Sequence, residues 1–270
     1  MTDGFAARLG RVIRESGRLC VGIDPHASLL ALWGLPDSAD GARTLGMRVV
    51  DAAAGVAGAV KPQVAFFERH GSAGYAALEA VLAHARAAGL LVVADAKRGD
   101  VGTTVDAYGE AWLTPGSPLE ADALTAVAYQ GIGSLDPVIA RAEAAGKGVF
   151  VLAATSNREA AVTQRSLRED GRTVAAGVVA DVRARASQAL GLVLGATIRA
   201  EDAGIRLEDV TGLPVLAPGF GAQGARLADI DHLFGPAAPL VLANVARSVL
   251  GAGPDGLDDA IRRAGEEVDG

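Results

Sequence analysis

Eight short apolar segments alternate with longer segments of helical period, and this alternation constrains the fold more than any other feature. The predicted strands are residues 19–23, 58–60, 91–94, 123–127, 149–153, 192–195, 215–217 and 240–243. Between them, apolar residues such as Leu45, Val49, Ala52 and Val56 recur every three or four positions, as in helices that cover a sheet. Apolar strands separated by amphipathic helices indicate a parallel sheet buried on both faces. We therefore predict an α/β fold, a (β/α)8 TIM barrel, with an open doubly wound sheet as the alternative.

Composition limits the class of protein. The 270 residues are 50% hydrophobic, enough for one large core, so we expect a single barrel domain over residues 1–270. A net charge of −7 and the lack of long basic runs argue against binding to nucleic acid or to an anionic membrane, but a small anionic ligand is compatible. The single Cys20 allows no internal disulfide and is expected to be a core residue. The N-terminal sequence is unlike a signal peptide, and no segment is apolar enough to span a membrane, so a cytoplasmic location is expected.

Charged residues are concentrated where the predicted strands end. The run Asp95-Ala96-Lys97-Arg98-Gly99-Asp100 follows a buried strand, and Asp24 and Lys61 end two others. Charges in such places are normally paired with each other, a metal or a substrate, and strand ends face the active site of a barrel. Only three lysines occur in the chain, and two of them are at these ends. The third, Lys147, is expected at the surface.

A second signal follows the last two predicted strands. A glycine-rich turn occupies residues 218–224, and Arg247 follows strand eight. Glycines let backbone N–H groups approach an anion, and barrels commonly bind phosphate at this place. Arg247 would add a bidentate charge. Together these features predict a phosphate site.

These motifs resemble those of the orotidine 5'-monophosphate decarboxylases, in the longer form common among actinobacteria, over essentially the whole chain. The matching elements are residues 22–25, 60–63, 95–101, Thr104, Ser156, residues 217–224 and Arg247. The resemblance implies a barrel that forms a homodimer through its active-site face. It also implies conversion of orotidine 5'-monophosphate to UMP and carbon dioxide without a metal or organic cofactor.

The resemblance also implies roles for single residues. Lys97 would donate the proton to the ring carbon that loses carbon dioxide, and Asp95 would lie beside the departing carboxylate in a chain of alternating charge with Lys61. Asp100 and Thr104 would reach into the partner's site. The expected substrate-binding residues are Asp24 and Lys61 at the ribose, Ser156 at the pyrimidine, Gln223 between base and phosphate, Pro218, and Arg247 at the phosphate.

Some positions depart from the family pattern. Ala246 precedes Arg247 where many relatives have glycine, and residues 128–131 lack an asparagine that is typical of the long form. His26 follows Asp24-Pro25 but is expected to be a loop or supporting residue rather than an acid or base. Residues 163–173 are expected to form a loop that leads into a helix, either as a mobile lid or as an ordinary surface connection.

Three other functions remain open from the sequence. A metal-dependent sugar-phosphate decarboxylase or aldolase of the same superfamily shares the D-x-K-x-x-D pattern, but it characteristically has an acidic residue near the position of Lys61. A Schiff-base aldolase would need Lys97 as a free amine, whereas the neighbouring carboxylates favour its charged form. A non-catalytic nucleotide-binding barrel would not require the charged array.

Overall fold

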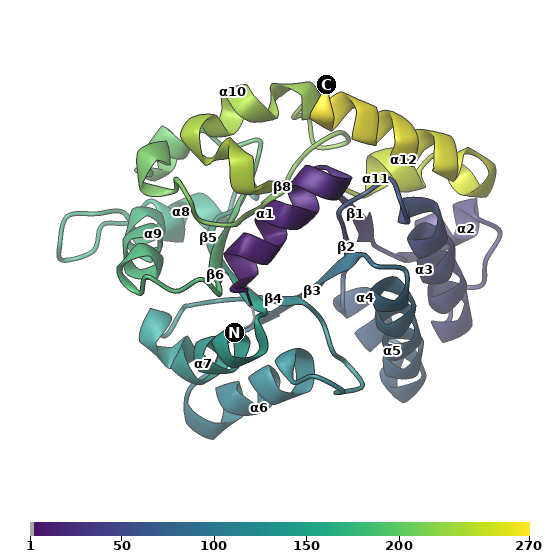
Figure 1. Ribbon diagram of the computed structural model, residues 1–270, viewed down its shortest axis with the longest axis horizontal. Coiled ribbons are helices and arrows are strands. Elements are labelled where there is room, and N and C mark those ends of the chain that lie inside the picture. The colour runs from purple at the N-terminus through teal and green to yellow at the C-terminus, as the bar shows by residue number, and fades with distance from the viewer. Residues whose placement is uncertain (1–2) are drawn as a thin grey trace.

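Eight parallel strands close into a barrel in the computed structural model, which describes residues 3–270 (Figure 1). Each strand pairs with its neighbours in the sequence, and β8 pairs with β1 to close the sheet. The strands are β1 (Leu19–Ile23), β2 (Ala59–Pro62), β3 (Leu91–Arg98), β4 (Ala123–Ala126), β5 (Gly148–Ala154), β6 (Leu190–Leu194), β7 (Val215–Pro218) and β8 (Val241–Val245). The predicted (β/α)8 architecture is confirmed, and all eight predicted segments contain a strand.

Helices surround the barrel and bury their apolar faces against it (Figure 1). They are α1 (Phe5–Ser16), α2 (Ala27–Leu32), α3 (Ala39–Ala53), α4 (Ala65–Glu68), α5 (Gly71–Ala87), α6 (Gly102–Leu113), α7 (Asp136–Ala145), α8 (Ala160–Gln164), α9 (Val174–Ala184), α10 (Ile230–Phe234), α11 (Arg247–Leu250) and α12 (Gly253–Asp269). Between β6 and β7 the chain forms two short 3-10 helices, Ala200–Ala203 and Leu207–Asp209, in place of an α-helix. Among the described helices, none is long and apolar enough to cross a membrane.

Helix α1 crosses one end of the barrel and fills its interior from that side (Figure 1). Phe5 packs edge-on against Phe150 of β5, with ring centroids 5.7 Å apart, and both belong to a buried cluster contributed by strands around the barrel. Gly148 makes room for this contact, because a Cβ atom there would lie 2.4 Å from the Phe5 ring. The interior is therefore a packed core, and a ligand can enter only from the opposite end.

Charged side chains are also buried at the amino ends of the strands. Lys147 precedes β5, is 4% exposed, and donates to Glu120 at 2.8 Å. Nearby, Asp122 pairs with Arg8 at 2.5 Å and accepts the Val92 N–H. The expectation that Lys147 lies at the surface is wrong, because Glu120 supplies a partner that allows the ammonium to be buried.

Residues 165–173 form a loop that leads into α9, as predicted, but Thr163 and Gln164 at the start of the predicted loop belong to α8. Leu167 bridges to Thr173 across the loop, and the Thr173 hydroxyl accepts the Ala176 N–H to cap α9. Val162 and Leu167 are 80% and 73% exposed. Closure of this segment as a lid stays a prediction.

Candidate active site

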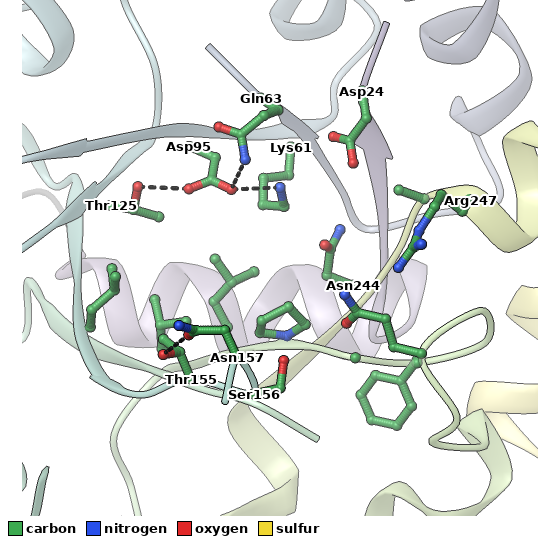
Figure 2. Close-up of a pocket in the computed structure, with 18 of the residues that line it drawn as sticks. Asp24, Lys61, Gln63, Asp95, Thr125, Thr155, Ser156, Asn157, Asn244 and Arg247 are labelled. Atoms are coloured by element: carbon green, nitrogen blue, oxygen red, sulfur yellow. Dashed lines mark hydrogen bonds and ion pairs between the residues drawn. The ribbon is translucent and has the colours of Figure 1, made fainter. Parts of the chain in front are cut away.

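A cavity of about 450 Å³ opens at the carboxyl ends of the strands. Figure 2 shows side chains from several strands pointing into it. Its lining residues are Asp24, Lys61, Gln63, Asp95, Lys97, Thr125, Leu152, Thr155, Ser156, Asn157, Val193, Leu216, Pro218, Gly219, Phe220, Ala222, Gln223, Asn244, Ala246 and Arg247. All the predicted site residues are among them except Asp100 and Thr104.

The Asp95 carboxylate is the centre of the polar network. One oxygen accepts from Lys61 Nζ at 2.8 Å and from Gln63 Nε2 at 2.9 Å. The other accepts from Lys97 Nζ at 2.6 Å. The hydroxyl of Thr125 donates a hydrogen bond to this same oxygen at 3.0 Å (Figure 2). The carboxylate thus has four donors, which is all that its lone pairs can accept.

Burial and charge act in opposite directions on this network. Burial opposes ionisation of Asp95, but Lys61 and Lys97 outweigh it and hold the pKa of Asp95 well below its usual range. Burial likewise opposes the charge on Lys61, but Asp95 and Asp24 raise the pKa of Lys61 above its ordinary value. Both groups are therefore ionised at neutral pH.

Asp24 extends the charge array toward the open part of the cavity. It follows β1 directly, and its Oδ1 atom is buried without a hydrogen-bond partner among the described residues. A buried carboxylate oxygen without a donor is unfavourable. A ligand with hydroxyl groups would supply the missing donor.

Across the cavity from Asp95, the lining comes from the ends of β7 and β8, where the sequence predicts a phosphate site (Figure 2). The turn after β7 is closed by its own backbone, because Gly221 donates to the Ala225 carbonyl at 2.8 Å. Gly221 has φ +68°, and a Cβ atom there would lie 2.5 Å from the Ser248 hydroxyl, so a larger residue would distort the turn. Gln223 and Arg247 line the cavity from this side.

The exit of β5 provides a third group of polar side chains. Thr155 donates to Asn157 at 2.8 Å, and Gln164 of α8 binds both the Thr155 N–H and its hydroxyl at 2.9 Å. Ser156 lies between them and lines the cavity, as predicted. The loop is thus held by α8, the helix that begins just after it.

Asp100 and Thr104 are not brought together with the other predicted residues within one chain. The Asp100 carboxylate accepts the N–H of Val101 at 2.8 Å, and Thr104 is exposed on α6. Neither lines the cavity of its own chain. Their role in a partner's site stays a prediction.

Sequence reasoning assigned no role to several polar lining residues, including three on the barrel strands or at their ends. Thr125 of β4 and Gln63 after β2 bind Asp95, and Asn244 of β8 donates to the Cys20 carbonyl at 3.1 Å. Gln63 and Asn244 stand at predicted strand ends, so their position was a usable signal. Thr125 lies within a predicted strand, and only its inward direction distinguishes it.

Two other residues have the places expected for them. Cys20 is buried, and this burial raises the pKa of its thiol to about 12. His26 caps α2 by accepting the Leu29 N–H and does not line the cavity. Among residues 3–270, no three His, Cys, Asp or Glu side chains are grouped as a metal site would require.

Comparisons with known proteins all indicate the same family. Residues 17–260 match the model of the orotidine 5'-phosphate decarboxylase / HUMPS family. The orotidine 5'-phosphate decarboxylases of Salinispora tropica and Streptomyces coelicolor are each 49% identical to the chain. The alignments cover 98% of the chain and 96% of the former protein, and 94% of the chain and 92% of the latter.

Solved structures agree with this similarity. The crystal structure of a Streptomyces avermitilis protein, 47% identical, superposes with a TM-score of 0.93 over 99% of this chain and 95% of that one. The Leishmania donovani OMP decarboxylase, 30% identical, superposes with a TM-score of 0.79 over 98% of this chain and 97% of that one. The resemblance seen in the motifs is therefore confirmed, and the chain belongs to the orotidine 5'-phosphate decarboxylase / HUMPS family.

Proposed function

We propose that the protein is a carboxy-lyase that converts orotidine 5'-monophosphate to UMP and carbon dioxide in pyrimidine biosynthesis. The observation that carries the proposal is the Asp95 carboxylate held between two ammonium groups, Lys61 at 2.8 Å and Lys97 at 2.6 Å, at the carboxyl end of the barrel. Family membership supplies the reaction, and this geometry supplies the charges that the reaction needs.

Decarboxylation breaks the bond between the ring and its carboxylate and leaves an electron pair on a ring carbon. Resonance stabilises that pair poorly, so the protein must supply a charge that interacts more strongly with the transition state than with the substrate. The ammonium of Lys97 stabilises this electron pair as carbon dioxide leaves, and it then donates its proton to the same ring carbon. Lys97 recovers a proton from solvent.

Asp95 contributes in two ways. It holds Lys61 charged and accepts a hydrogen bond from the Lys97 ammonium, and it repels a substrate carboxylate placed beside it. Two carboxylates about 4 Å apart repel by about 4 kcal/mol at an effective dielectric near 20. Rate enhancements of enzymes correspond to about 8–23 kcal/mol, so this repulsion is a minor share and the preorganised cation the larger one.

The remaining lining residues would bind the nucleotide away from the reacting carbon. Asp24 and Lys61 bind ribose hydroxyls, which satisfies the buried Asp24 oxygen. Ser156 contacts the pyrimidine, Gln223 bridges base and phosphate, Arg247 binds the phosphate, and Pro218 lines the same cavity. Binding energy from the phosphate orients the ring for reaction.

The direct test is carbon dioxide release and absorbance change when purified protein is added to orotidine 5'-monophosphate in the presence of EDTA. We expect full turnover, since the charge array replaces a metal. Turnover that disappears in EDTA and returns with a divalent cation would favour the metal-dependent sugar-phosphate class. Trapping of a substrate on Lys97 by borohydride would favour a Schiff-base aldolase, and UMP binding with no turnover a non-catalytic barrel.

The protein would act as a homodimer with Asp100 and Thr104 completing the partner's site. The support is their place on the rim of the barrel, outside the cavity of their own chain. Mixing Lys97→Ala with Asp100→Ala protein should then restore part of the activity in heterodimers. Subunit exchange without recovery of activity would contradict shared sites. The cytoplasmic location stays a prediction.

A further inference from the structure

Strands β3 and β4 lose their regular register beside the charged network. Ala94 pairs with Leu124, and the next paired residues are Arg98 and Ala126. Four residues of β3 therefore advance against two of β4, which places Asp95, Ala96 and Lys97 opposite the single residue Thr125. Such bulges redirect side chains and remove backbone partners from the ladder.

Thr125 compensates for this irregularity with its side chain. Its hydroxyl oxygen accepts the backbone N–H of Lys97 at 2.9 Å. The same hydroxyl donates its proton to the Asp95 carboxylate at 3.0 Å (Figure 2). A hydroxyl has one proton and two lone pairs, so it makes both bonds at once. The residue is 1% exposed, so water does not replace it readily.

The backbone of Lys97 requires such support. Its φ angle is +48°, a left-handed conformation that is unfavourable for any residue with a Cβ atom. This conformation persists only if surrounding contacts determine it. The Thr125 hydroxyl supplies one such contact and binds, in Asp95, the carboxylate that also receives the Lys97 ammonium.

We propose that Thr125 is a positioning residue of the active site, which fixes the Lys97 backbone and the Asp95 carboxylate relative to each other. It does not touch the reacting atoms. Its hydroxyl determines where the Lys97 ammonium lies, and thus how well the proton donor is aligned. The proposal rests on the decarboxylase function given above.

The test compares Thr125→Val, which keeps the shape but loses the hydroxyl, with Thr125→Ser, which keeps the hydroxyl but loses the methyl. We expect kcat for orotidine 5'-monophosphate to fall about 10- to 100-fold in Thr125→Val, since small misplacements of a reacting group have effects of this size. The dissociation constant of UMP should change less than about threefold, because the proposed nucleotide contacts are elsewhere. Thr125→Ser should keep kcat within about threefold of the wild type.

Three results would overturn the proposal. They are a kcat in Thr125→Val within about threefold of the wild type, an equal loss of kcat in Thr125→Ser, and a loss of UMP binding as large as the loss of kcat. If Thr125→Val does not fold, Thr125→Ala removes the same hydroxyl with less steric conflict and is measured in the same way. Failure of the proposed function is distinct, because wild-type protein would then show no turnover of orotidine 5'-monophosphate.

Discussion

The barrel buries a lysine–carboxylate pair at each end, and the two pairs are alike in geometry but different in surroundings. Lys61 and Lys147 are each 4% exposed, and each donates to a carboxylate at 2.8 Å. At the amino end, the second oxygen of Glu120 accepts the Gly116 N–H, and the pair does not line the cavity. At the carboxyl end, a second ammonium shares Asp95, and the pair opens on the cavity.

The pKa values of the two lysines shift in opposite directions. Asp95 and Asp24 outweigh burial and raise the pKa of Lys61, whereas burial outweighs Glu120 and lowers the pKa of Lys147. A buried ion pair is therefore not in itself a sign of function. What distinguishes the carboxyl end is that two ammonium groups donate to one carboxylate and polar atoms are left for a ligand, whereas the second cation near Glu120, Arg86, lies 4.0 Å away.

Replacing each lysine by methionine should have the largest effect and tests whether the two ends of the barrel differ in function. Lys61→Met should lower kcat/KM about 100-fold or more, because it removes both a charge of the array and a proposed ribose contact. Lys147→Met should leave kcat/KM within about twofold and lower the free energy of unfolding by about 1–3 kcal/mol, since Glu120 loses its ammonium donor but keeps the Gly116 N–H. Steady-state kinetics and urea unfolding measure both. Equal losses of activity would show that the two ends are not functionally distinct.

The next expected effect is on nucleotide binding at the proposed phosphate site. Arg247→Ala should raise the dissociation constant of UMP about 100-fold and that of uridine less than about threefold, because a guanidinium binds phosphate through charged hydrogen bonds. Calorimetry with both ligands separates the two effects. Arg263→Ala, on the exposed face of α12, is the matched control and should change neither. Equal losses for UMP and uridine in Arg247→Ala would remove the assignment.

The smallest effect is on stability in acid. Lys61 and Lys97 hold the pKa of Asp95 below its ordinary 3.8, so the unfolded chain takes up a proton at this position before the folded chain does. The charged form therefore stabilises the fold above about pH 4, and this contribution declines as pH falls further. The difference in unfolding free energy between wild type and Asp95→Asn should shrink by about 2 kcal/mol from pH 5 to pH 2.

Urea unfolding at several pH values measures this difference. Asp258→Asn, which removes a carboxylate at an exposed position of α12, is measured in the same way as the control. A constant difference for Asp95→Asn would mean that the lysines do not hold its carboxylate in the charged form.

Local patterns predicted the strands and most of the site, because strand ends of a barrel converge at one face. Contacts between distant segments were not predictable in this way. Lys147 looked like a surface residue because its partner Glu120 lies in another loop. The role of Thr125 could not be predicted because it depends on the register between two strands. Between two successive pairings, β3 advances by four residues and β4 by two, and neither segment alone shows this.

In the proposed reaction Lys97, the second ammonium bound to Asp95, donates the proton. The most direct measurement is carbon dioxide release from carboxyl-labelled orotidine 5'-monophosphate by Lys97→Ala, with UMP binding measured on the same protein. We predict that turnover falls at least about 1,000-fold while UMP still binds within about tenfold of the wild type. Turnover within tenfold of the wild type would contradict the role of Lys97 as the proton donor.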